Sequence, residues 1–264
     1  MINLFIQILA SVMVAIAGYK RKSLTISGAV GTIIVGSAVS IGFGYRGLLL
    51  LGLFFASSNF WSKYKVEDKD SLKNKVEKGE QRDIIQVFAN GGIGAMASLM
   101  FAWTDTVTWL ILFVGSIAAA TADTWASEIG TLSKKKPILL LKMKRVDAGT
   151  SGAVSPLGTF AAAAGSLLIS LLAFFVWPEV SFIMFIGLTL IGFGGNLIDT
   201  IIGATVQVVY KCSVCGMETE KHNHCGQKTI YFKGFRSCNN DVVNFLSILL
   251  ASVVGTYFLT ILLG

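Results

Sequence analysis

Four short segments of the chain combine carboxylate, amide and glycine residues in a way that suits metal and phosphate chemistry. They read QRDIIQVFANGGIGA, ADTWASEIG, GGNLIDTIIGATVQ and NNDVVNF. Carboxylate and amide oxygens are hard ligands, which suit Mg²⁺ better than Zn²⁺. Because Mg²⁺ in proteins is usually held by one or two carboxylates together with substrate phosphates, the four segments predict a magnesium–phosphate site.

The polar residues of these segments recur at helical spacing. On an expected helix the members of each of three sets share one face: Arg82, Gln86 and Asn90; Asn196, Asp199, Gly203 and Gln207; and Asn240 or Asp241 with Asn244 and Ser247. Such residues also hydrogen-bond one transmembrane helix to another, which is a purely structural explanation for any single set. With ADTWASEIG they make four sets at one depth, two of them with an intramembrane aspartate, which favours a shared site.

Asp123 and Glu128 raise a separate question, because they are five residues apart. On an unbroken helix their side chains point roughly 140° away from each other. They can therefore bind one ion only if the helix ends or kinks between them, or if each carboxylate meets a different neighbour.

Phosphate groups also need cations and backbone N–H groups. Arg82, Lys144 and Arg145 are basic residues close to the polar segments. Glycine-rich sequences whose amides can turn toward an anion contain Asn90, Gly91, Gly92, Gly149, Thr150, Ser151 and Gly152. The sequence has no GxxxxGK[ST] phosphate loop. Helix capping explains Ser155 as an N-cap and Pro156 at the first helical position.

Residues 212–225 read CSVCGMETEKHNHC and contain a second group of candidate ligands. Cys212, Cys215 and Cys225 with His222 or His224 provide thiolate and imidazole ligands of the kind that bind zinc, and we adopt the set with His224. Four protein ligands leave no open position, so the zinc would be a structural clip of the loop 206–241. Reduced thiols without a metal are the alternative, since a disulfide is not expected on a cytoplasmic loop.

Composition places all of these residues in a membrane protein. Of the 264 residues 53% are apolar and only 14% are charged, against about 25% charged in soluble domains. The apolar runs are continuous, which predicts an all-α, polytopic fold in one transmembrane domain over residues 1–264. Seven to eight spans are expected, and the eight are 2–18, 24–42, 46–61, 84–102, 106–123, 153–176, 181–205 and 242–262. We expect the first span to be retained and not cleaved.

Basic residues give the expected orientation. The loops 19–23, 62–83, 124–152 and 206–241 hold all but one of the 22 lysines and arginines. The positive-inside rule makes these loops cytoplasmic and both termini external, in the cell membrane. Loop 62–83 is basic, and we expect it to form a solvated helix, with a disordered stretch as the alternative. Because the basic residues are spread over four membrane loops, nucleic acid is not an expected partner.

As an ordered set, QVFANGGIGA, ADTWASEIG, GTSGAVSPLGT, LIDTIIGATVQ and NNDVVNF resemble the integral-membrane family of transmembrane protein 19 and the plant and cyanobacterial phytyl-phosphate kinases. The resemblance covers the chain from about residue 20 onward. It implies a kinase that transfers phosphate from a nucleoside triphosphate to an isoprenyl monophosphate. A more distant similarity to membrane enzymes that use CTP makes CTP the favoured donor.

The resemblance also implies roles for individual residues. Asp123, Asp199 and Asp241 would bind Mg²⁺, together with Glu128. Phosphate or metal would be held by Asn90, Asn196 and Asn244, with Gln207 and Asn240 beside them, and phosphate charge would be neutralised by Arg82, Lys144 and Arg145. The cysteine cluster is not part of the resemblance.

Three other functions remain open at this point. An ion-coupled transporter also uses intramembrane acids and glycine-broken helices, but its acids lie near the midplane. A cytidylyltransferase that makes a CDP-lipid needs the same metal, nucleotide and lipid anion. A membrane scaffold would use the polar faces for packing alone. The oligomeric state is not indicated by the sequence.

Overall fold

The computed structural model describes residues 2–65, 79 and 81–264. It is mostly helical, as predicted, and seven helices in these residues are long and apolar enough to cross a membrane. They are α1 (Ile2–Lys20), α2 (Ile26–Lys63), α3 (Ile84–Thr104), α4 (Val107–Gly130), α5 (Pro156–Val176), α6 (Phe182–Thr205) and α7 (Asn240–Leu263). Most of loop 62–83, where a solvated helix is expected, lies outside the described residues.

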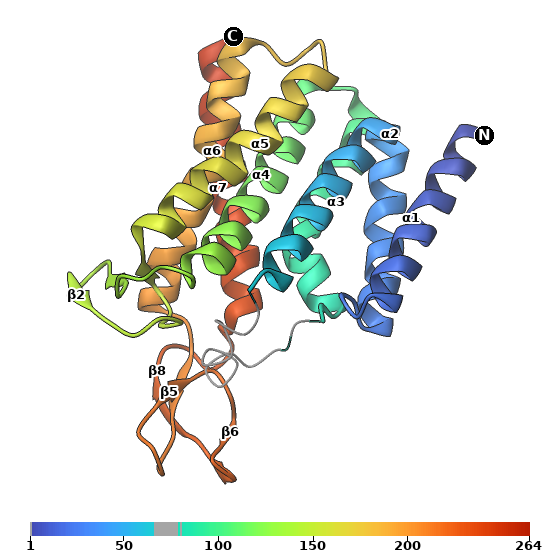
Figure 1. Ribbon diagram of the computed structural model, residues 1–264. Helices are drawn as coiled ribbons and strands as arrows, with labels where there is room; N and C mark the ends of the chain where they lie inside the picture. The colour runs from blue at the N-terminus through green and yellow to red at the C-terminus, as the bar shows by residue number, and fades with distance from the viewer. Residues whose placement is uncertain (1, 66–78, 80) are drawn as a thin grey trace.

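Helix α2 contains two of the predicted spans, because it reverses direction at Gly44. Gly44 has φ +58° and ψ −144°, a non-helical conformation that glycine adopts without a steric penalty. The two ends of α2 lie together: Thr25, its N-cap, accepts a backbone hydrogen bond from Gly28, while Lys63 Nζ at the far end donates to the carbonyl oxygen of Arg21. The two halves correspond to the predicted spans 24–42 and 46–61 (Figure 1).

Helix α4 forms the centre of the bundle. Every residue from Leu110 to Ala122 is buried, and the helix packs against α2, α3, α5, α6 and α7. At one end its Phe113 ring stacks on Phe43, with ring centroids 4.6 Å apart, and Trp177 packs edge-on against Phe43. On the outside of the bundle large apolar side chains such as Phe5, Phe160 and Phe175 are exposed, as expected for a surface that faces lipid.

Short strands, which the sequence did not predict, fold two of the connecting loops. Strands β1 (Ile138–Leu139), β2 (Lys144–Arg145) and β3 (Ala153–Val154) form one sheet, and β4 (Val209–Lys211), β5 (Glu218–Thr219) and β8 (Ile230–Lys233) form a second. Strands β6 (Asn223–His224) and β7 (Gln227–Lys228) form a hairpin. Elements of two to four residues are too short for an alternating pattern of apolar side chains, so the sequence contains no signal for them.

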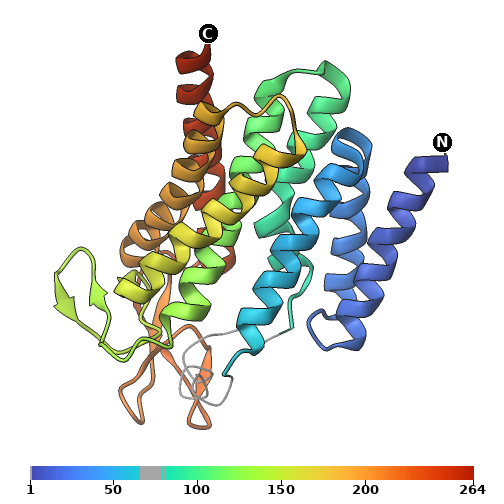
Figure 2. The ribbon, with the colours of Figure 1, turned by 45° about the horizontal axis from the view of Figure 1, so that its top comes forward.

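The loops gather at one end of the bundle, which we call the loop end: residues 21–25, 131–155 and 206–239. Both termini lie at the opposite end (Figures 1 and 2). Side-chain caps fix several helix starts at the loop end, and one of them is the predicted pair Ser155 and Pro156, where Ser155 Oγ accepts a hydrogen bond from the Gly158 N–H at 3.1 Å. The two termini therefore lie on the same side of the bundle. That this side is external remains a prediction.

Candidate functional site

A cavity of about 1070 Å³ lies at the loop end, where α3, α4, α6 and α7 begin or end. Most of the residues predicted to form the site line this cavity: Arg82, Asn90, Asp123, Glu128, Gly149, Thr150, Ser151, Gly152, Asn196, Asp199, Gln207, Asn240, Asp241 and Asn244. They come from segments up to 162 residues apart in the chain, Arg82 and Asn244 being the extremes. The helical packing therefore brings the four polar segments to one place.

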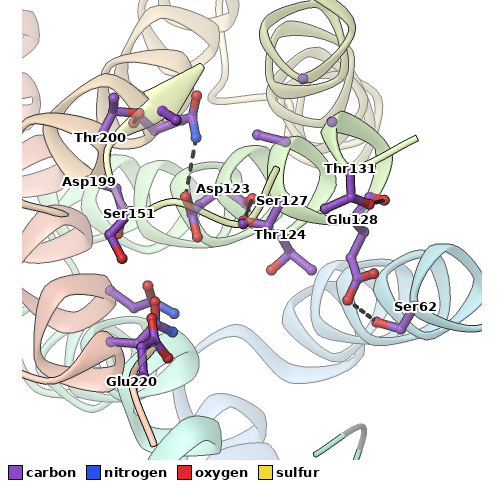
Figure 3. Close-up of a pocket in the computed structure, with 18 of the residues that line it drawn as sticks. Ser62, Asp123, Thr124, Ser127, Glu128, Thr131, Ser151, Asp199, Thr200 and Glu220 are labelled. Atoms are coloured by element: carbon purple, nitrogen blue, oxygen red, sulfur yellow. Dashed lines mark hydrogen bonds between the residues drawn. The ribbon is translucent and has the colours of Figure 1, made fainter. Parts of the chain in front are cut away.

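Asp123 on α4 and Asp199 on α6 form the acidic centre of the cavity. Asn196 Nδ2 donates a hydrogen bond to Asp123 Oδ1 at 3.1 Å, and the carboxyl groups of Asp123 and Asp199 are close enough to interact directly (Figure 3). Two carboxylates that share a low-dielectric site repel each other unless a cation or a proton lies between them. The pair is thus a suitable place for a divalent cation.

Helix α7 completes this centre from a third direction. Ser247 Oγ donates to Asp199 Oδ2 at 3.1 Å, and Asn244 Nδ2, with the amide turned to donate, lies 3.1 Å from the same oxygen. Asp241 is in the first turn of α7 and only 4% exposed, and Asn240 precedes it. Because the first N–H groups of a helix have no partner within the helix, this end of α7 favours negative charge nearby.

The carboxylates of Glu128 and Asp123 point in different directions from α4. Helix α4 continues unbroken to Gly130, so the two carboxylates point to different neighbours. Asp123 faces α6, whereas Glu128 Oε1 accepts a hydrogen bond from Ser62 Oγ on α2 at 2.7 Å (Figure 3). Glu128 therefore lines another part of the cavity and does not share a metal with Asp123 through α4 alone.

Arg82 supplies positive charge on the same side as Glu128. Its backbone is tied to the 23–25 segment, since Arg82 N donates to the Ser23 carbonyl and Thr25 N donates to the Arg82 carbonyl, both at 3.0 Å. Burial lowers the pKa of Arg82 below its ordinary value, and the nearby Glu128 carboxylate opposes that shift. An arginine remains protonated at neutral pH, so Arg82 is a fixed cation in the cavity wall.

The turn 149–152 closes the cavity beside the end of α6. Gly149 and Gly152 have φ of +78° and +77°, which other residues rarely adopt. A side chain at Gly152 would clash with Ala204, so glycine also allows the turn to contact the last turn of α6. Thr150 and Ser151 lie between the two glycines and line the cavity.

Four residues predicted for the site lie elsewhere. Gly91 and Gly92 are inside α3, where their N–H groups bond to carbonyls of the preceding turn, and Gly91 packs against Val35. Lys144 and Arg145 are exposed on β2 and do not line the cavity. The structure thus corrects their expected positions: β2 extends sideways from the bundle (Figure 1).

The sequence did not single out several residues that line the cavity, chiefly Lys22, Ser62, Thr200, Glu220 and Lys221. Glu220 is held by Gln207 Nε2, which donates to its Oε1 at 2.7 Å. Lys22 and Lys221 replace Lys144 and Arg145 as cations at the cavity. Lys22, Glu220 and Lys221 are in loops without periodicity, so only the folded chain reveals their position, whereas Ser62 and Thr200 are on α2 and α6.

The predicted zinc ligands Cys212, Cys215, His224 and Cys225 come together in the 206–239 loop, apart from the cavity lining. His222, the alternative ligand, instead packs against the Tyr210 ring, with ring centroids 4.6 Å apart.

A helical membrane bundle with an acidic, amide-rich cavity at one end defines a polytopic membrane protein with a polar site near one face of the membrane. The chain belongs to the family described as integral membrane protein DUF92, whose model matches residues 9–252. The membrane family expected from the ordered motifs is thereby confirmed.

Named relatives cover most of the chain. It is 34% identical to Protein PGR of Arabidopsis thaliana, over 95% of this chain and 94% of that protein. It is 33% identical to an uncharacterized membrane protein of Methanocaldococcus jannaschii, over 77% and 83%. It is 27% identical to Protein VTE6, chloroplastic, of Arabidopsis thaliana, over 96% and 68%. No solved structure matches the chain.

Proposed function

We propose that this protein is a membrane kinase that transfers a phosphoryl group from a nucleoside triphosphate, with CTP favoured, to an isoprenyl monophosphate such as phytyl or geranylgeranyl phosphate. The observation that supports this most is the convergence of Asp123, Asp199 and Asp241 from three helices in one cavity. The resemblance of the ordered motifs to phytyl-phosphate kinases supports the choice of substrate class.

The charges of the cavity support a metal–nucleotide substrate. Among the described residues, five carboxylates line it, Asp123, Glu128, Asp199, Glu220 and Asp241, and three cations, Lys22, Arg82 and Lys221. A bare triphosphate would be repelled by this excess of negative charge, and Mg²⁺ would reduce the repulsion because it neutralises two of the negative charges. When bound, Mg²⁺ would supply positive charge that offsets the negative charge of the phosphates during transfer.

The chain's own residues have distinct tasks in this proposal. Asp123 and Asp199 would hold the metal, with their carboxylates oriented by Asn196 and Ser247. Arg82 would bind phosphate oxygens, and the 149–152 turn would offer N–H and hydroxyl groups to them.

The reaction needs no general base. An oxygen of the isoprenyl monophosphate is already an anion, and it forms a new bond to the γ-phosphorus. The bond between that phosphorus and the β–γ bridging oxygen breaks, and the nucleoside diphosphate leaves with the electron pair. Catalysis then depends on positioning and on the charges around the phosphates, which the cavity residues provide.

The depth of the acids favours an enzyme at the membrane surface over an ion-coupled transporter. Asp123 is seven residues before the end of α4, and Asp199 is six before the end of α6. At about 1.5 Å per residue this is about 10 Å from the loop end, not the middle of the bundle. A cytoplasmic nucleotide could reach the cavity from the loop end, while the lipid stays in the membrane.

A product assay tests the proposal. The purified protein in detergent is given Mg²⁺, phytyl or geranylgeranyl monophosphate and each nucleoside triphosphate in turn, and the products are identified by mass spectrometry. We expect an isoprenyl diphosphate and the matching nucleoside diphosphate, most rapidly with CTP. A CDP-lipid with pyrophosphate would instead identify a cytidylyltransferase. No turnover and no nucleotide binding by the folded protein would leave the transporter or the scaffold as the better account.

A further inference from the structure

We propose that residues 206–239 form a zinc module, in which Cys212, Cys215, His224 and Cys225 hold one structural Zn²⁺ and thereby position Glu220 at the cavity. The module lies beyond the ends of α6 and α7 (Figure 1). This site is separate from the magnesium–phosphate site, and its evidence does not depend on the kinase reaction.

The four ligand atoms lie close to the spacing of a tetrahedral zinc site. One atom from each residue lies within 4.8 Å of the others. His224 Nδ1 is 3.2 Å from Cys225 Sγ and 3.5 Å from Cys215 Sγ. Ligands about 2.0–2.3 Å from a zinc at the centre of a tetrahedron are about 3.3–3.8 Å from one another. Small side-chain adjustments would therefore complete the site.

Two tight turns supply the ligands, two from each. In the first, Gly216 N donates to the Cys212 carbonyl at 3.0 Å and Cys212 N donates to the Met217 carbonyl at 2.9 Å. In the second, the β6–β7 hairpin turns at Cys225 and Gly226, which both have positive φ, 51° and 74°. This backbone conformation is uncommon for a cysteine and costs energy. The hairpin nevertheless holds Cys225 in it, and Cys225 thereby lies in the cluster.

The module has little hydrophobic core that could hold these turns without a metal. Its buried residues are Gln207, Val208, Val209, Tyr210, Cys212, Thr219 and Cys238, of which Gln207, Val208 and Cys238 lie within three residues of α6 or α7. The distal side chains, such as Val214, Ile230 and Phe232, are exposed. Small modules of this kind gain their folding free energy from metal binding. Because the protein fills all four positions, the zinc is structural and not catalytic.

The module connects directly to the cavity through one pair of strands. Strand β4 ends at Lys211, next to Cys212, and pairs with β5, where Tyr210 lies opposite Thr219 and Lys211 opposite Glu218. Glu220 follows β5, lines the cavity and accepts the hydrogen bond from Gln207. Fixing Cys212 therefore fixes the strand pair that positions Glu220.

Metal analysis of the purified protein tests the site without any activity assay. We expect about one zinc per chain in the wild type and less than about a tenth of that in Cys215→Ala and Cys225→Ala. The matched controls His222→Ala and Cys238→Ala change the same residue types outside the cluster and should retain the metal. Cobalt in place of zinc should show the charge-transfer and visible bands of tetrahedral thiolate ligation. Iron in place of zinc, or equal zinc in Cys215→Ala and wild type, would overturn the proposal.

Hydrogen exchange tests the connection to the cavity. In Cys215→Ala, the amides of residues 209–211 and 218–220 should exchange at least tenfold faster than in the wild type, while the amides of α4 stay protected. Unchanged exchange at residues 218–220 after complete loss of zinc would show that the metal does not position Glu220. Loss of protection in α4 as well would contradict a role confined to the module.

Discussion

Asp199 accepts a hydrogen bond from Ser247, and it accepts a second from Asn244 when the Asn244 amide is turned to donate. Its neighbour Asp123 accepts a hydrogen bond from Asn196. Each carboxylate is thus held by a side chain on another helix. A group oriented in this way can bind a metal without rearrangement, which is what phosphoryl transfer requires of its metal ligands. The same partners would hold an asparagine at these positions in nearly the same place, so charge can be removed without changing shape.

Asp199→Asn and Asp123→Asn should each lower kcat for isoprenyl diphosphate formation by about 100-fold or more, because the metal loses a charged ligand. Steady-state kinetics at several Mg²⁺ concentrations measures this change, and the Mg²⁺ requirement should rise. The control is Asp105→Asn, at the opposite end of the bundle, where Asp105 is the left-handed C-cap of α3 that asparagine also tolerates. Full activity of both cavity variants would remove these residues from the site.

Arg82→Gln should raise KM for the nucleoside triphosphate by about tenfold, because a charge-assisted hydrogen bond to phosphate is lost. The matched control Arg46→Gln changes the one basic residue of the chain outside the four basic loops. Isothermal titration with the nucleotide and Mg²⁺ measures the affinity directly. Equal affinity in Arg82→Gln and the wild type would exclude Arg82 from phosphate binding.

At the scale of elements, the half of α2 before Gly44 packs closely against α3 through small residues. A Cβ at Gly42 would clash with the carbonyl oxygen of Ser98 on α3, whereas a Cβ at Gly52 would meet no atom within 4 Å. Gly42→Ala must therefore separate α2 from α3. Gly52→Ala adds a methyl group in open space.

Gly42→Ala should lower the free energy of unfolding by about 1–3 kcal/mol, since it overpacks the α2–α3 interface. Gly52→Ala, the control, should be neutral or raise it by about 0.5–1 kcal/mol, because alanine favours the helix. Thermal unfolding in detergent, followed by circular dichroism, compares the two. A larger loss in Gly52→Ala than in Gly42→Ala would contradict the packing of α2 on α3.

The sequence predicted most of these elements but misjudged the end of one. The spans 84–102, 181–205 and 242–262 agree closely with α3, α6 and α7, because long apolar runs leave few choices in a membrane. The span 106–123 is too short, since α4 continues through ADTWASEIG to Gly130. The polar residues of ADTWASEIG end the apolar run that sets the predicted boundary, but the helix continues through them and places them in the wall of the cavity, where the sequence predicts a site. Helical spacing identified Asn196 and Asp199, whereas Glu220 depends on strands that leave no pattern.

At the scale of the whole molecule, both termini lie at one end of the bundle (Figure 1), and residues of the opposite end line the cavity. All but one of the 22 lysines and arginines are in the loops 19–23, 62–83, 124–152 and 206–241, and the described parts of these loops lie at the same end as the cavity. This distribution predicts that the loop end, with the cavity, faces the cytoplasm. A cytoplasmic nucleotide could then enter without crossing the membrane.

Alkaline phosphatase fused after Gly264 should be active in a bacterial host, because that enzyme folds only outside the cytoplasm. The same reporter fused after Lys136, in a loop of the loop end, should be inactive, and green fluorescent protein should give the reverse result at both positions. Fluorescence from the fusion at Gly264 would place the termini inside and contradict the expected orientation.

The central claim is that the acidic cavity transfers a γ-phosphoryl group to a lipid phosphate. The most direct measurement is to follow the label from γ-³²P-CTP into phytyl monophosphate with the wild type and Asp199→Asn in parallel, both in the presence of Mg²⁺. The account predicts label in the terminal phosphate of phytyl diphosphate with the wild type and about 100-fold less with Asp199→Asn. Equal transfer by both proteins would contradict the site. A folded wild type that neither binds nucleoside triphosphates nor transfers label from any of them would contradict the function.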